Sequence, residues 1–165
     1  MRRIQHFING QHKEGTSGRS SDVYDPATGK VQAQVDLASV AEVHEAVAAA
    51  KTAAVHWAES SLTQRTQIMF RFRELLAART DELARVISGE HGKVVSDAAG
   101  EVTRGLENVE FACGIAHHLK GEINEQVSEG IEVYSLRQPL GVVAGITPFN
   151  FPAMVPAWML SLIHI

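Results

Sequence analysis

The sequence predicts an α/β fold, and three observations along the chain support this. Residues 7–11, around the turn pair Asn9-Gly10, and residues 31–35 read as short strands. The long middle region repeats apolar residues every three or four positions, which is typical of helices that are covered on one face. Residues 141–146 form a short, continuous apolar run, and such a run suits a strand buried on both faces of a parallel sheet.

Start and stop signals divide the middle region into four predicted helices. Ser39 and Glu42 have the spacing of a capping box, in which each side chain accepts a hydrogen bond from the other residue's amide. The next three helices are expected to start near residues 61–63, at Thr80 and near residues 96–97, and Gly92 and Gly121 suit the ends of the last two. The side chains predicted to face inward are Val40, Val43, Val47, Ala50, Ala54 and Trp57 in the first helix, Ile68, Phe72, Leu75 and Leu76 in the second, Leu83, Val86 and Ile87 in the third, and Val102, Leu106, Val109, Cys113 and Ala116 in the fourth.

Composition excludes several classes of protein. A chain of 165 residues is long enough for one domain with a core, and its net charge is only −4. Basic residues do not cluster, which argues against nucleic acid, and no apolar run approaches the roughly 20 residues of a membrane span. His117 and His118 would point about 100° apart on a helix, so we expect no metal site there. Cys113 is the only cysteine, so the chain cannot form an internal disulfide.

The stretch that follows the predicted 141–146 strand is the main candidate for a functional site. Pro148 cannot extend a ladder, and Pro152 suits the first position of a helix, so a stiff loop is predicted between them. Ligands bind at this carboxyl end of the strands in open α/β sheets. The Asn150 amide could donate to negative charge developing on a carbonyl oxygen there. From the residues alone, an asparagine that only ties its own loop together carries more weight.

The segment PLGVVAGITPFNFP at 139–152 resembles the signature of the NAD(P)-dependent aldehyde dehydrogenase superfamily. Three further segments, EHGK at 90–93, RGLENVEFAC at 104–113 and FNFPAMVP at 149–156, resemble the CoA-acylating methylmalonate-semialdehyde dehydrogenases within it. The resemblance extends from Phe7 to about Met159 and covers the front third of such an enzyme. It implies a β-meander, a helical layer, the start of a parallel Rossmann-like sheet, and an oligomerisation arm at about residues 122–138. Residues 1–165 would then be an incomplete N-terminal part of the NAD-binding domain, without the catalytic domain.

The resemblance also implies an activity. The full enzyme would oxidise methylmalonate or malonate semialdehyde with NAD, lose carbon dioxide, transfer the acyl group to coenzyme A, and form a homotetramer. Asn150 matches the family's oxyanion asparagine, and Arg104 matches an arginine that binds the substrate carboxylate. The nucleophilic cysteine would lie beyond residue 165, and Cys113 matches a core helix position. The positions at the nicotinamide end of the cofactor are Ile146, Thr147, Pro148 and Phe149.

Two alternatives remain open. The first is a dehydrogenase for another aldehyde, such as succinate semialdehyde, although residues 90–93 and 104–107 argue against it. The second is a non-catalytic chain that only associates with full-length subunits through residues 131–138. The sequence departs from the family pattern after Met159, so we expect a truncated chain that is inactive alone. Arg2 and Arg3 precede no apolar signal core and the family body starts at Phe7, so we expect a cytoplasmic protein.

Overall fold

The computed structural model describes residues 1–165 and contains seven strands and five α-helices. β2 (His6–Ile8) and β3 (Gln11–Lys13) form an antiparallel hairpin. Both of its turn residues have positive φ, 52° at Asn9 and 74° at Gly10, as a tight two-residue turn requires. β5 (Lys30–Asp36) lies between β1 (Arg2–Ile4), which is parallel to it, and β4 (Ser20–Asp25), which is antiparallel. Both strand regions that the sequence predicts near the N-terminus are confirmed.

All four helices predicted in the middle region are present. α1 (Val40–Glu59) starts at the predicted Ser39–Glu42 capping box, and α2 (Leu62–Ala78) starts at a second one, formed by Ser61 and Gln64. α3 (Thr80–His91) ends at Gly92, whose φ of 84° favours glycine. α4 (Val95–Cys113) ends earlier than predicted, because Gly114 and a short 3-10 turn, η1 (Ile115–His117), follow it.

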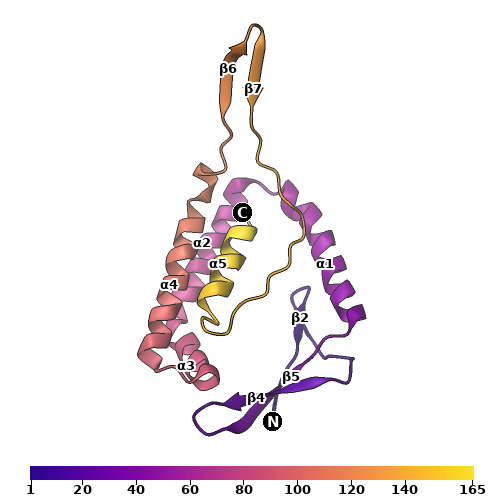
Figure 1. Ribbon diagram of the computed structural model, residues 1–165, viewed down its shortest axis with the longest axis vertical. Coiled ribbons are helices and arrows are strands. Elements are labelled where there is room, and N and C mark those ends of the chain that lie inside the picture. Colours follow the sequence, from indigo (N-terminus) through magenta and orange to yellow (C-terminus); the bar gives the residue numbers. More distant parts are fainter.

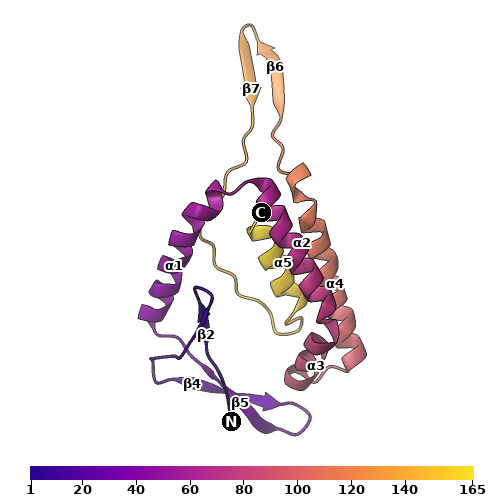
Figure 2. The same cartoon turned by 180° about the vertical axis from the view of Figure 1, so that it is seen from behind.

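The helical core forms around α4, which packs against α2, α3 and α5 (Met154–Ile163). Figures 1 and 2 show these helices side by side. The predicted inward stripe of α4 is confirmed, since Val102, Val109 and Cys113 are buried and the other two residues are partly buried. Predictions for α2 and α3 are partly wrong, because α2 packs along only one long helix and α3 along one helix and β4. The residues predicted inward but found exposed are Ile68, Leu75 and Val86, and Met69 is buried in α2 instead.

Two apolar surfaces that were predicted to be covered are open in the structure. No helix or strand packs along α1, so Val40, Val43 and Val47 are exposed. Residues 141–146 form no strand, and the backbone of residues 136–149 makes no hydrogen bond within the chain. In Figure 1 this segment is the long connection between β7 (Ile131–Tyr134) and α5. The predicted buried parallel strand is therefore wrong for this structure, because no other strand lies beside the segment to pair with it.

A hairpin of β6 (Ile123–Ser128) and β7 projects from the body of the molecule (Figures 1 and 2). Every residue of both strands is exposed. The hairpin lies within residues 122–138, where the sequence resemblance predicts an arm. No helix combines the length and the apolar character that crossing a membrane requires.

Candidate functional site

The candidate site is organised by a buried carboxylate between α4 and α5. Glu101 is inaccessible to solvent, and its Oε1 accepts hydrogen bonds from the backbone N–H groups of Ala153 (2.8 Å) and Met154 (3.2 Å). These groups open α5, so the carboxylate satisfies free donors at the positive end of the helix. α5 therefore starts at Met154, two residues later than the sequence-predicted start at Pro152.

Lys93 donates to the other oxygen of this carboxylate and links it to the loop that contains Asn150. Lys93 Nζ lies 2.6 Å from Glu101 Oε2 and also donates to the main-chain oxygen of Asn150 at 3.0 Å. The same ammonium lies 4.8 Å from the centroid of the Phe151 ring. Burial alone would raise the pKa of the Glu101 carboxyl, but the bonds from Lys93, Ala153 and Met154 outweigh it and the pKa is lowered. Glu101 is therefore ionised and pairs with a lysine whose side chain is only 10% exposed.

Asn150 presents its side chain to solvent at the end of this anchored loop. Its main-chain oxygen is held by Lys93, whereas its carboxamide is exposed and makes no hydrogen bond within the chain. The amide therefore does not tie its own loop together in this structure. It is free to donate to a ligand from a backbone position that the protein fixes.

Arg104 lies on α4 beside the same loop. Its guanidinium carbon is 5.9 Å from the Phe151 ring centroid, and the exposed side chain has no carboxylate partner in the chain. The neighbouring Gly105 allows α5 to come close, because a Cβ there would lie 3.2 Å from that of Ala157. Gly100 and Gly105 each cost roughly 1 kcal/mol inside a helix relative to alanine, which predicts that a neighbour comes close to this face of α4. This prediction is confirmed at Gly105 and wrong at Gly100, where a side chain would meet open space.

The four residues expected at the nicotinamide end of a cofactor lie in the exposed loop before Asn150. Ile146 is almost fully exposed, and Phe149 packs its ring against His91 with centroids 5.2 Å apart. Phe149 also lines a hollow of about 520 Å³ between the N-terminal sheet and the end of α3. Its lining residues include Ile4, Tyr24, Pro26 and Glu90. Thr147 and Pro148 make no hydrogen bond within the chain, so their main-chain oxygens and the Thr147 side chain and N–H are free.

Cys113 lies at the end of α4 and is buried. Burial raises the pKa of its thiol, and the nearby Glu110 carboxylate acts in the same direction. Both effects disfavour the thiolate, which is the nucleophilic form. This placement supports the interpretation of Cys113 as a core residue.

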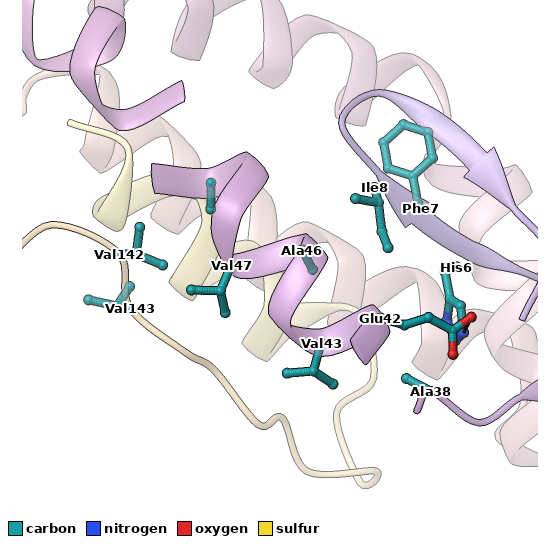
Figure 3. Close-up of a pocket in the computed structure, with 11 residues that line it drawn as sticks. His6, Phe7, Ile8, Ala38, Glu42, Val43, Ala46, Val47, Val142 and Val143 are labelled. Atoms are coloured by element: carbon teal, nitrogen blue, oxygen red, sulfur yellow. Dashed lines mark ion pairs between the residues drawn. The ribbon is translucent and has the colours of Figure 1, made fainter. Parts of the chain in front are cut away.

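A second hollow, of about 360 Å³, lies between α1, the β2–β3 hairpin and residues 142–143 (Figure 3). Most of its wall is apolar, with contributions from Phe7, Val43 and Val143. The one carboxylate, Glu42, accepts from the backbone amides of Ser39 and Thr16, which lower its pKa to about 2. These bonds occupy Glu42 in fixing the start of α1, and the other titratable side chain in the wall is His6, whose Nε2 lies 3.8 Å from Glu42 Oε1.

Sequence reasoning missed the two residues that hold the site together. The sequence analysis named Lys93 only as part of the 90–93 motif and assigned no role to Glu101. A signal for Glu101 was present, because it lies three residues after Ala98 and four before Gly105, on the buried face of α4. An acidic residue on such a face requires a buried partner, and the partner is the charge of Lys93 together with two helix N–H groups.

Comparisons with known proteins point to one family. Residues 12–163 match the model of the aldehyde dehydrogenase family. The malonate-semialdehyde dehydrogenase of Pseudomonas aeruginosa is 46% identical over 162 residues, which are 98% of this chain and 32% of that protein. Malonate-semialdehyde dehydrogenase 3 of Geobacillus kaustophilus is 50% identical over 159 residues, which are 96% of this chain and 33% of the relative.

Solved structures of methylmalonate-semialdehyde dehydrogenases also match this chain over about a third of their length. The crystal structure of methylmalonate-semialdehyde dehydrogenase from Oceanimonas doudoroffii matches with a TM-score of 0.93 at 50% identity, over 98% of this chain and 33% of that one. A candidate methylmalonate-semialdehyde dehydrogenase from Sinorhizobium meliloti 1021, complexed with NAD, also gives 0.93, at 48% identity and the same coverage. The chain thus spans about a third of the length of these relatives, and the predicted fold class, the N-terminal part of the aldehyde dehydrogenase fold, is confirmed. The chain belongs to the aldehyde dehydrogenase family.

Proposed function

We propose that this chain supplies the N-terminal part of an enzyme that oxidises methylmalonate or malonate semialdehyde with NAD, releases carbon dioxide and transfers the acyl group to coenzyme A. The observation that carries this proposal is that two free polar groups flank Phe151. The Asn150 carboxamide belongs to the residue before it, and the Arg104 guanidinium lies against its ring. The names of the relatives support the chemistry, and the rat relative is named as acylating.

Arg104 is suited to select the substrate. Methylmalonate and malonate semialdehydes each carry a carboxylate in addition to the aldehyde, and a guanidinium can bind a carboxylate through two parallel hydrogen bonds. Arg104 has no acidic partner in the chain that would compete with such a ligand. Its contact with the Phe151 ring limits the directions in which the guanidinium can point.

Asn150 is suited to stabilise the reacting oxygen. Its free NH₂ group would donate to the aldehyde oxygen as negative charge develops there. NAD, when bound, supplies the acceptor for the hydride that leaves the substrate. Residues 146–149 fit contact with one end of that cofactor, because they present exposed apolar side chains and free main-chain groups. The chain has no glycine-rich phosphate turn of the G-x-G-x-x-G type, so these residues would hold only the nicotinamide end.

The β6–β7 hairpin is proposed to pair with a neighbouring subunit of a homo-oligomer. Both strands are exposed, and each has an edge with unpaired backbone groups that another chain could extend. The same observation favours a second candidate function, association with full-length subunits without catalysis. Exposed apolar side chains on the hairpin that would support either contact are Ile123, Val127, Ile131, Val133 and Tyr134.

A chimera tests the proposed function. Residues 1–159 would replace the matched segment of the Pseudomonas aeruginosa relative, which supplies the remaining two thirds of the enzyme. We expect the chimera to reduce NAD in the presence of methylmalonate or malonate semialdehyde and to form an acyl-CoA when coenzyme A is added. If the chimera oxidised succinate semialdehyde faster than methylmalonate or malonate semialdehyde, the result would favour a dehydrogenase for that other aldehyde. A folded but inactive chimera, with the 165-residue chain co-purifying with the full-length relative, would favour the second candidate.

A further inference from the structure

We propose that Lys93 and Glu101 are positioning residues that hold the Asn150 loop, so that the Asn150 amide is aimed at the reacting oxygen. This inference rests on the proposed function. Neither residue needs to touch the substrate, because each acts through the backbone of residues 150–154.

The geometry forms a continuous chain of contacts from α4 to Asn150. One oxygen of Glu101 accepts from Ala153 and Met154 and fixes the start of α5. The other accepts from Lys93, whose Nζ donates to the Asn150 main-chain oxygen at 3.0 Å. The loop is therefore held at both ends, at residue 150 by the lysine and at residues 153–154 by the glutamate.

The bond from Lys93 is the only hydrogen bond to Asn150 within the chain. The preceding residues, 136–149, make no backbone hydrogen bond, and the Asn150 side chain has no partner. The orientation of the amide thus depends on the bond from Lys93. That bond in turn depends on Glu101, because a lysine this deeply buried requires an opposite charge.

The main variant is Lys93→Met in the chimera, which keeps much of the side-chain volume and removes the donor. The matched control is Lys120→Met, the same change at an exposed lysine with no recorded ion pair or hydrogen bond. We expect Lys93→Met to lower kcat by about 10- to 100-fold, as for loss of precise positioning. The KM for the semialdehyde should change little, because Arg104 still binds the carboxylate.

A double-mutant cycle separates positioning from simple structural support. Asn150→Ala removes the amide but keeps the main-chain oxygen to which Lys93 donates, so the two changes are chemically independent. If Lys93 acts through Asn150, the decrease in kcat caused by Lys93→Met should be only about twofold or less in the Asn150→Ala background. An equal loss in both backgrounds would overturn the proposal.

Hydrogen exchange provides a readout that does not require activity. We expect the Ala153 and Met154 amides, which donate to Glu101, to exchange faster in Lys93→Met, while those of α4 keep their protection. Unchanged exchange of the Ala153 and Met154 amides would overturn the proposal even in an active chimera. An inactive chimera with this selective loss of protection would instead count against the proposed function and leave the anchoring intact. If Lys93→Met does not fold, the Lys93→Met/Glu101→Gln pair removes both buried charges and is measured in the same way.

Discussion

Similar sequence patterns lead to burial in one region of this chain and to exposure in another. The first region is the helical layer, and the second is α1 together with residues 136–149. α4 is in contact with α2, α3 and α5, and residues such as Ala98, Val102 and Val109 lose nearly all exposure. α1 is longer than α4 and starts at a capping box, which α4 lacks, yet no other helix or strand packs along it. Residues 136–149 include an apolar run that suits a strand, yet their backbone is unpaired.

The difference teaches that an element's own sequence decides whether it forms, and its neighbours decide whether it is buried. A capping box satisfies donors within a few residues and needs no partner elsewhere. A strand needs another strand, and an apolar helix face needs a surface to cover it. We expect α1 and residues 136–149 to acquire those partners in the chimera, and four predictions test the contrast.

The largest effect is expected at the buried carboxylate of the helical layer. Glu101→Ala leaves Lys93 without its partner and two N–H groups of α5 unsatisfied, which should cost about 3 to 5 kcal/mol in the free energy of unfolding. The matched change in the hairpin is Glu132→Ala, at an exposed residue of β7, and it should cost no more than about 0.5 kcal/mol. Urea unfolding followed by circular dichroism measures both. Similar costs would mean that Glu101 is not the anchor of α5.

The next effect concerns catalysis at the end of the unpaired segment. Asn150→Ala in the chimera removes one donor to the developing oxyanion and should lower kcat about 100- to 1000-fold. Cys113→Ser is the control, because the thiol is buried and its raised pKa makes it a poor nucleophile. It should reduce stability and leave the chemistry nearly intact. If Cys113→Ser abolished turnover and Asn150→Ala did not, both assignments would be reversed.

A smaller and selective effect is expected at Arg104, on the exposed face of the helical layer. Hydrogen bonds between charged groups contribute about 1.5 to 3 kcal/mol, so Arg104→Leu should lower kcat/KM for methylmalonate semialdehyde roughly 10- to 100-fold. Propanal has no carboxylate and should be affected far less. The measurement is kcat/KM for both aldehydes on the chimera and its variant. Equal losses for the two substrates would assign Arg104 to the fold.

Sequence reasoning succeeded wherever the determining contacts are local. The Ser39–Glu42 capping box, the Asn9-Gly10 turn and the glycine that ends α3 each act over a few residues, and all three are confirmed. The stripe of α4 was also predictable, because its spacing is regular over several turns. The site residues Asn150 and Arg104 came from a family resemblance, and the structure places both beside Phe151. Their roles stay predictions.

What sequence reasoning could not supply depends on long-range partners. The bonds from Glu101 to residues 153 and 154 join positions that are 52 and 53 residues apart. No local pattern specifies such a pairing. The predicted burial of Val43 and of residues 141–146 was wrong for the same reason. A periodic or apolar pattern shows which face is suited to burial, but it does not supply the surface that covers that face.

The smallest effect compares two valines, one from each region. Val109 is fully buried on α4, and Val40 is 72% exposed at the start of α1. Val109→Ala removes two buried methyl groups and leaves a cavity, so it should cost roughly 2 kcal/mol in the free energy of unfolding. Val40→Ala in the 165-residue chain should stay within about 0.5 kcal/mol of zero, since its side chain already contacts water. Urea unfolding of each variant in the chain and in the chimera gives four values. We expect only the Val40 value to rise in the chimera, where the rest of the enzyme can cover α1. An unchanged Val40 value there would mean that this part of the apolar face of α1 stays open in the enzyme.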